Sequence, residues 1–198
     1  MASNQRRKAR VLAALVFMAL WLDGSFYPLL LLPFAFVLYY EREGLAKIGL
    51  GGSGLRESVF LGLGVGLAVS VVSYPIFIHY LSRRLSTSPG LIDLLVDLVW
   101  YPVYEEVSYR GFFLASFADL EESFSVRNLG LVLVQAIFFV LVHQNHILAG
   151  LYILLIPVFL LGFSMGLVFL KTRSIAGCIL GHSLINLVGH FLPSVVTG

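Results

Sequence analysis

Long runs of apolar residues, separated by short polar or glycine-rich connections, are the main pattern along the chain. Several runs reach the ~20 residues that an α-helix needs to cross the ~30 Å apolar core of a bilayer, and most are too long for buried strands. The pattern therefore predicts an all-α, polytopic transmembrane helix bundle with about seven spans, in a range of six to eight. The predicted spans are residues 11–22, 26–40, 58–81, 91–118, 129–145, 150–170 and 174–192.

The first two runs depart from this pattern. A 12-residue helix such as 11–22 is only ~18 Å long at ~1.5 Å per residue, and Pro28 and Pro33 interrupt the second run. Two interpretations stay open. Either the first helix extends back through the basic stretch before it, or residues 11–40 form a helical hairpin that does not cross the bilayer fully.

The composition agrees with a membrane protein. Of 198 residues, 59% are hydrophobic and only 12% are charged, whereas soluble domains carry about 25% charged residues. We expect one membrane-embedded domain over residues 1–198. Its surroundings would be the lipid bilayer, and we expect no nucleic-acid partner. Cys178 is the single cysteine, which excludes a disulfide framework and predicts a small packed residue.

Basic residues in the connections indicate the orientation of the chain. With a cytoplasmic N-terminus and seven spans, the outer connections hold only Arg83 and Arg84. The positive-inside rule then favours a cytoplasmic N-terminus and an outward C-terminus. The inner segments hold Arg6, Arg7, Lys8, Arg10, Arg42, Lys47, Arg56, Arg127, Lys171 and Arg173.

One apolar run, WYPVYEEVSYRGFF at residues 100–113, contains Glu105, Glu106 and Arg110. A charge inside a span costs roughly 2.5–3.5 kcal/mol on insertion scales, so such residues point to a functional site. Glu106 and Arg110 are four residues apart and can form an ion pair on one helix face. Glu105 is rotated by ~100° from Glu106, which leaves its carboxylate for chemistry.

Two later runs carry further polar faces. Phe139 and His143 are four residues apart, and His182, Asn186 and His190 form a polar stripe on the last predicted helix. Three such faces are expected to meet inside the bundle. A carboxylate beside an imidazole can activate a water as a general base, and a second imidazole with an amide can stabilise an oxyanion. This set is competent for peptide hydrolysis without a covalent intermediate.

The same residues resemble the motifs of a known family. EEVSYR (105–110), FVLVH (139–143) and HSLIN (182–186) match the EExxxR, FxxxH and HxxxN motifs of the CAAX-protease and bacteriocin-processing family of intramembrane proteases. This family is abbreviated CPBP or Abi and includes the Ras-converting CAAX endoprotease. The resemblance covers the motif-bearing core, at about residues 90–190. Its order and its placement on three separate helices also agree with the family.

The resemblance implies a role for each matching residue. Glu105 and His143 would activate the hydrolytic water, and His182 and Asn186 would form the oxyanion hole. Glu106, Arg110 and Phe139 would support the site. The implied substrate is a membrane-anchored or lipidated peptide or protein, cleaved near its C-terminus. Short connections favour a prokaryotic plasma membrane, in which the substrate need not be prenylated.

Other functions stay open at this point. No cofactor is expected, although Glu105, His143 and His182 could hold zinc with an open fourth position. Ser53, in the sequence GGSG, is a weak candidate for a serine nucleophile because it lies in a polar connection. A carrier, a proton relay or a non-catalytic scaffold of the same fold is the alternative from a different class.

Two polar residues and two glycine patterns lie outside the three motifs. Asp97 lies about two turns before Glu105, where it could line a water path or bond to a neighbouring helix. His146 could extend the polar face of His143 or cap the end of that helix. The sequences GLGVG (62–66) and GFSMG (162–166) each place two glycines four residues apart, which predicts close helix packing rather than nucleotide binding.

Overall fold

The computed structural model describes residues 45–50, 54–81 and 90–191. Its regular elements are all helical, and these residues contain no strand, which confirms the all-α class. The predicted spans 11–22 and 26–40 lie outside the described residues, as do Ser53, Arg83 and Arg84.

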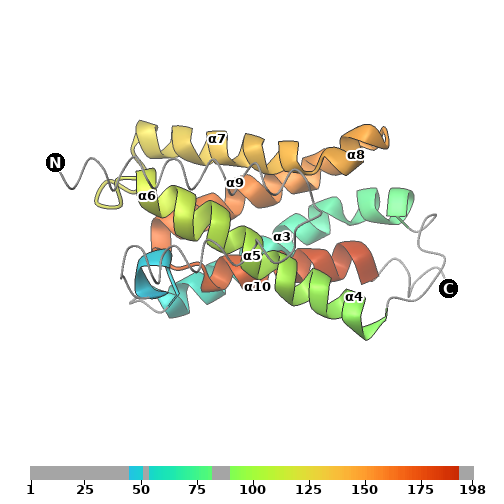
Figure 1. Cartoon of the computed structure of the whole chain (residues 1–198), viewed down its shortest axis with the longest axis horizontal. Helices are drawn as coiled ribbons and strands as arrows, with labels where there is room; N and C mark the ends of the chain where they lie inside the picture. The colour runs from blue at the N-terminus through green and yellow to red at the C-terminus, as the bar shows by residue number, and fades with distance from the viewer. Residues whose placement is uncertain (1–44, 51–53, 82–89, 192–198) are drawn as a thin grey trace.

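The five remaining apolar runs are each helical, as predicted. Figure 1 labels the helices, and its colours follow the chain. The first of the five is α3, at Leu55–Leu81. A continuous helix then consists of α4 (Leu91–Leu95), η4 (Val96–Trp100), α5 (Tyr101–Glu106), η5 (Val107–Leu114) and α6 (Ala115–Phe117). The other elements are a single turn η3 (Leu45–Ile48), α7 (Val126–Val142), α8 (Gln144–Leu148), η6 (Tyr152–Leu154), α9 (Leu155–Thr172), α10 (Ala176–Asn186) and η7 (Leu187–Phe191).

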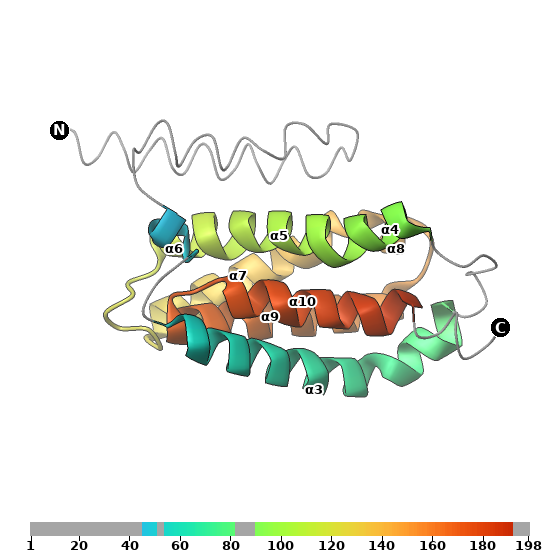
Figure 2. The same cartoon turned by 90° about the horizontal axis from the view of Figure 1, so that it is seen from below.

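The long helices lie side by side as a bundle, and α10 occupies its middle (Figure 2). α3 covers one side of α10 and α5 the other, while α9 packs on α3 and α7. The central position of α10 brings the HxxxN motif next to the helix that carries the glutamates.

Two of the described helices are long and apolar enough to cross a membrane, Leu55–His79 and Tyr152–Thr172. Val126–Val142 and Ala176–Gly189 are apolar but shorter. The prediction of about seven spans is therefore not confirmed, and the described residues support a helical bundle with two membrane-capable helices. The helix from Leu91 to Phe117 differs from both because it contains the buried charges.

The backbones of α3 and α10 approach each other closely. A Cβ added at Gly62 would lie 2.0 Å from the carbonyl oxygen of Gly177, and one at Gly66 would lie 2.7 Å from that of Gly181. By contrast, a Cβ at Gly64 would meet nothing within 4 Å. This confirms the close packing predicted from the 62–66 pattern, and it fixes α10 directly before His182.

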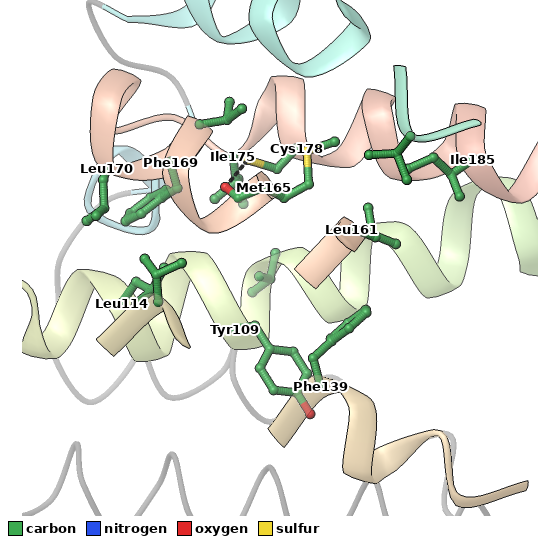
Figure 3. Close-up of a cluster of buried hydrophobic side chains, with 14 of the residues drawn as sticks. Tyr109, Leu114, Phe139, Leu161, Met165, Phe169, Leu170, Ile175, Cys178 and Ile185 are labelled. Atoms are coloured by element: carbon green, nitrogen blue, oxygen red, sulfur yellow. Dashed lines mark hydrogen bonds between the residues drawn. The ribbon is translucent and has the colours of Figure 1, made fainter. Parts of the chain in front are cut away.

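The second glycine pair packs against side chains of α7. A Cβ at Gly162 would lie 3.1 Å from Phe139, and one at Gly166 would lie 2.7 Å from Val132. Large side chains fill the rest of the core, as Figure 3 shows around Tyr109, Phe139 and Met165. Cys178 is buried there, with its Sγ 3.4 Å from the Met165 carbonyl oxygen, so it is a packed residue as predicted.

The predicted run 129–145 is interrupted near its end. α7 stops at Val142, and His143 has φ −83° and ψ 37°. Its N–H donates to the Val140 carbonyl at 3.0 Å, a shorter connection than an α-helical turn makes. The chain then continues into α8. His143 therefore lies at a helix end, where the sequence pattern had placed it inside a span.

Candidate active site

The helix containing α5 and η5 places both glutamates and Arg110 in the interior. Glu105 is 3% exposed, and Glu106 and Arg110 are fully buried. Arg110 Nη1 donates to Glu106 Oε1 at 3.1 Å, which confirms the predicted pair. Arg110 Nη2 donates to the Gly162 carbonyl on α9 at 2.8 Å. The pair thus joins two helices, because the guanidinium has donors left for a second acceptor.

His182, from α10, lies between the two carboxylates. Its Nδ1 is 2.9 Å from Glu106 Oε1, and its Nε2 is 3.7 Å from Glu105 Oε2. A carboxylate only accepts hydrogen bonds, so Nδ1 carries a proton and donates to Glu106. The backbone positions of the two glutamates differ by ~100°, and one imidazole offers a different nitrogen to each carboxylate.

Phe139, from α7, connects the two histidines. Its ring centroid is 4.9 Å from that of His143 and 6.0 Å from that of His182. Arg110 lies over the same ring, with its Cζ 5.2 Å from the centroid. His143 Nδ1 is 2.7 Å from the Phe139 carbonyl, an acceptor, so this nitrogen carries a proton and donates. The second motif therefore meets the other two around Phe139.

Asn186, the other site residue predicted on α10, bonds to the helix of the glutamates. Its Nδ2 donates to the backbone carbonyl of Asp97 at 2.8 Å. The acceptor in this bond is the main chain of Asp97, so the two roles predicted for its side chain stay predictions. His182 and Asn186 are thus both held against one helix, at two different levels.

His146 extends the polar face of His143. The two imidazoles are stacked, with centroids 6.0 Å apart and planes inclined by 25°. His146 lies within α8, three residues after His143. The side chain of His190 is not among those described.

The charge count of the cluster indicates its chemistry. Glu105, Glu106 and Arg110 carry a net charge of −1 when all three are ionised, and one proton on the Glu105–His182 pair neutralises them. Neutral or paired groups are the form that a buried site tolerates. Within the described part of the chain, Glu105 Oε2 and Glu106 Oε2 are buried and accept no hydrogen bond. The site can therefore hold a proton and offer an acceptor to a bound molecule.

The described side chains do not fit a three-ligand zinc site. Among them, no group of three or more His, Cys, Asp or Glu residues is arranged to hold a metal ion. The reason is visible at His182, whose nitrogens are directed at two carboxylates and whose Nδ1 is bound to one of them.

Two contacts between helices at the site were not predicted from the sequence. The bonds of Glu106 to His182 and of Arg110 to Gly162 have no counterpart in local spacing. The HxxxN spacing places His182 and Asn186 on one face, but it does not indicate which carboxylate or carbonyl that face will meet.

Comparison with known proteins agrees with the three motifs. Residues 87–188 match the family described as type II CAAX prenyl endopeptidase, Rce1-like. The curated proteins and the solved structures gave no match. The family points to a protease and, together with the apolar helices, to an integral membrane protein. Because the match covers more than half of the chain, the protein belongs to the Rce1-like family of type II CAAX prenyl endopeptidases.

Proposed function

We propose that the protein is an intramembrane endopeptidase that cleaves a membrane-associated substrate near its C-terminus. The observation that carries this proposal is the position of His182, which approaches Glu105 with one nitrogen and Glu106 with the other. A buried pair of carboxylates bound to an imidazole and a guanidinium is costly to maintain in a helix bundle. In our proposal, chemistry at Glu105 is the reason that the bundle contains this costly cluster.

In the proposed reaction, Glu105 takes a proton from a water that His143 helps to orient. The resulting hydroxide attacks the carbonyl carbon of the scissile peptide bond, and the carbonyl oxygen becomes an oxyanion. His182 and Asn186 donate hydrogen bonds to that oxygen. The proton on Glu105 then passes to the leaving nitrogen as the C–N bond breaks, which regenerates the carboxylate.

The contacts of His182 support its role as an oxyanion donor. With Nδ1 bound to Glu106, only Nε2 can donate to the substrate, and this requires the doubly protonated ring. With His182 in that form, the net charge of the cluster is zero. The cluster consists of Glu105, Glu106, Arg110 and His182. Arg110 and Glu106 thus act indirectly, because they orient the imidazole and hold its charge.

The proposed substrate is an extended peptide segment anchored to the bilayer by a lipid or an apolar segment. A helical substrate has no free backbone groups to offer a protease, so the cleaved segment must be unwound or already extended. A prenylated CAAX peptide is the first substrate to test, because the family takes its name from such substrates.

We further propose that the protein lies in a prokaryotic plasma membrane with its N-terminus in the cytoplasm. The asymmetric distribution of Lys and Arg supports this orientation. Reporter fusions at both termini would test it, and an N-terminal reporter that is active only outside the cytoplasm would reverse it.

Cleavage of a prenylated CAAX peptide by the purified protein tests the proposed activity. The assay is run in parallel on the Glu105→Ala variant and with a metal chelator. Cleavage that disappears in the variant and survives the chelator supports the glutamate mechanism. Loss with the chelator and recovery with zinc would replace it by a metalloprotease mechanism. If the intact protein cleaves neither this peptide nor any member of a peptide library, a carrier or scaffold role replaces proteolysis.

A further inference from the structure

The bond between Asn186 and Asp97 occurs where the helix of the glutamates changes its winding. Val96–Trp100 (η4) is a π-helical turn, and Pro102 is the second residue after it. An α-helix would supply the Asp97 carbonyl with the N–H of residue 101, and a π-helix with that of residue 102. The Tyr101 N–H donates to Val96 instead, and a proline at position 102 has no N–H to donate.

Asn186 occupies the place of the missing helical donor. Its Nδ2 reaches the Asp97 carbonyl at 2.8 Å from the neighbouring helix α10. Because a carbonyl only accepts, this contact determines that the nitrogen end of the amide faces Asp97. It uses one of the two N–H groups of Asn186 and fixes the direction of the second.

We propose that Pro102 is a positioning residue that orients the Asn186 amide by leaving the Asp97 carbonyl to it. This inference rests on the proposed function, in which the second N–H of Asn186 donates to the oxyanion. Pro102 is buried and lies three residues before Glu105. One short stretch of helix therefore carries the general base and, through its interrupted hydrogen bonding, sets the direction of an oxyanion donor.

A purely structural role for Pro102 makes a different prediction. A proline that only bends or terminates a helix affects packing, and its replacement would change stability without depending on Asn186. The chain offers a matched control in Pro75, which lies inside α3, is exposed, and has no part in the site.

The test restores an N–H at position 102. Pro102→Ala does so with loss of volume, and Pro102→Val does so with similar volume. The new N–H competes with Asn186 for the Asp97 carbonyl. We expect kcat for CAAX-peptide cleavage to fall by about 10-fold, part of the ~10²–10³-fold loss that follows removal of a whole oxyanion donor. KM should stay within about 2-fold, because ground-state binding does not use this donor, and Pro75→Ala should keep the kcat of the unmodified protein.

The double variant decides between orientation and packing. In an Asn186→Ala background, Pro102→Val should change kcat by less than about 2-fold, because the group that it orients is gone. If Pro102→Val lowers kcat by the same factor with and without Asn186, the proposal is overturned.

Melting temperature gives a readout that does not need activity. The loss of Tm caused by Asn186→Ala should be smaller when Pro102→Val is already present, because both changes remove the same hydrogen bond. Independent effects on Tm would also overturn the proposal. If the intact protein cleaves no peptide, the proposed function fails, and the Tm cycle still tests the link between Pro102 and Asn186.

Discussion

Within the residues that the structure describes, two pairs of opposite charges differ in almost everything except their chemistry. Glu106 and Arg110 are fully buried and 3.1 Å apart, and His182 and the Gly162 carbonyl take up further hydrogen bonds. Glu57 and Lys171 connect α3 with α9 at 3.9 Å, and their side chains are 52% and 54% exposed. At the exposed pair, solvent water can replace a lost partner. Solvent does not reach the buried pair. The cost of removing a charge should therefore depend on its surroundings and not on the presence of an ion pair.

The largest effect is expected for Glu105→Gln, which tests whether the buried charges serve chemistry. The amide has nearly the same shape but cannot take a proton from water. We expect kcat/KM for peptide cleavage to fall by ~10²–10⁴-fold, while the variant keeps its fold and its Tm. The exposed Glu121→Gln is the control. A fully active Glu105→Gln enzyme would contradict water activation by the Glu105 carboxylate.

Arg110→Ala tests the buried pair as a structural element. It leaves Glu106 buried without its cation and removes the donor to Gly162. Breaking a buried pair from one side typically costs ~3–5 kcal/mol. We expect a loss of this size in the free energy of unfolding, measured by denaturant titration in detergent micelles. Arg110→Lys should recover only part of it, because an ammonium lacks the planar fork that reaches both acceptors. An Arg110→Ala variant as stable as the original protein would remove the distinction between the two pairs.

Gly62→Ala separates the contribution of packing from that of charge. The added methyl group meets the backbone of α10 at Gly177, which cannot move aside as a flexible side chain could. Overpacking of this kind typically costs ~1–3 kcal/mol, and we expect that loss of stability. Gly64→Ala is matched in chemistry and in helix, but its methyl group enters open space. Equal melting temperatures for the two variants would show that α3 and α10 are not in the close contact described here.

Lys171→Ala completes the comparison with the smallest expected effect. Exposed ion pairs are worth ~0–1 kcal/mol and weaken further with salt. The unfolding free energy should therefore change by less than about 1 kcal/mol, and cleavage should not change. If Lys171→Ala lowers the unfolding free energy as much as Arg110→Ala does, the exposed pair stabilises the fold as strongly as the buried pair.

Much of the fold followed from the sequence because it depends on local patterns. The five apolar runs after residue 54 are helices, and the pairing of Glu106 with Arg110 follows from their four-residue spacing. The glycine pair at 62 and 66 correctly indicated close packing, because two small residues one turn apart favour it whatever the partner helix is. The break at His143 was not predicted, since hydropathy does not distinguish a helix end from its interior.

Buried polar residues outside the motifs were also missed. Asn128 is fully buried, and its amide binds the main chain of Asp119, Glu122 and Ser123, which shapes the connection between α6 and α7. A single asparagine near the start of an apolar run carries no signal that separates this role from a surface position. Only the path of the preceding loop shows that three carbonyls converge on it.

The sequence alone determined the helical class, the family and the residues that could do chemistry, because each depends on residue type at a short, fixed spacing. The tertiary structure decided which of these residues meet. His182 reaches both glutamates and Asn186 reaches the Asp97 carbonyl because α10 is packed between α3 and the helix of the glutamates. Contacts between residues about 80 positions apart, such as Glu106 and His182, depend on how whole helices pack. That arrangement arises from many weak contacts together, and no single motif encodes it.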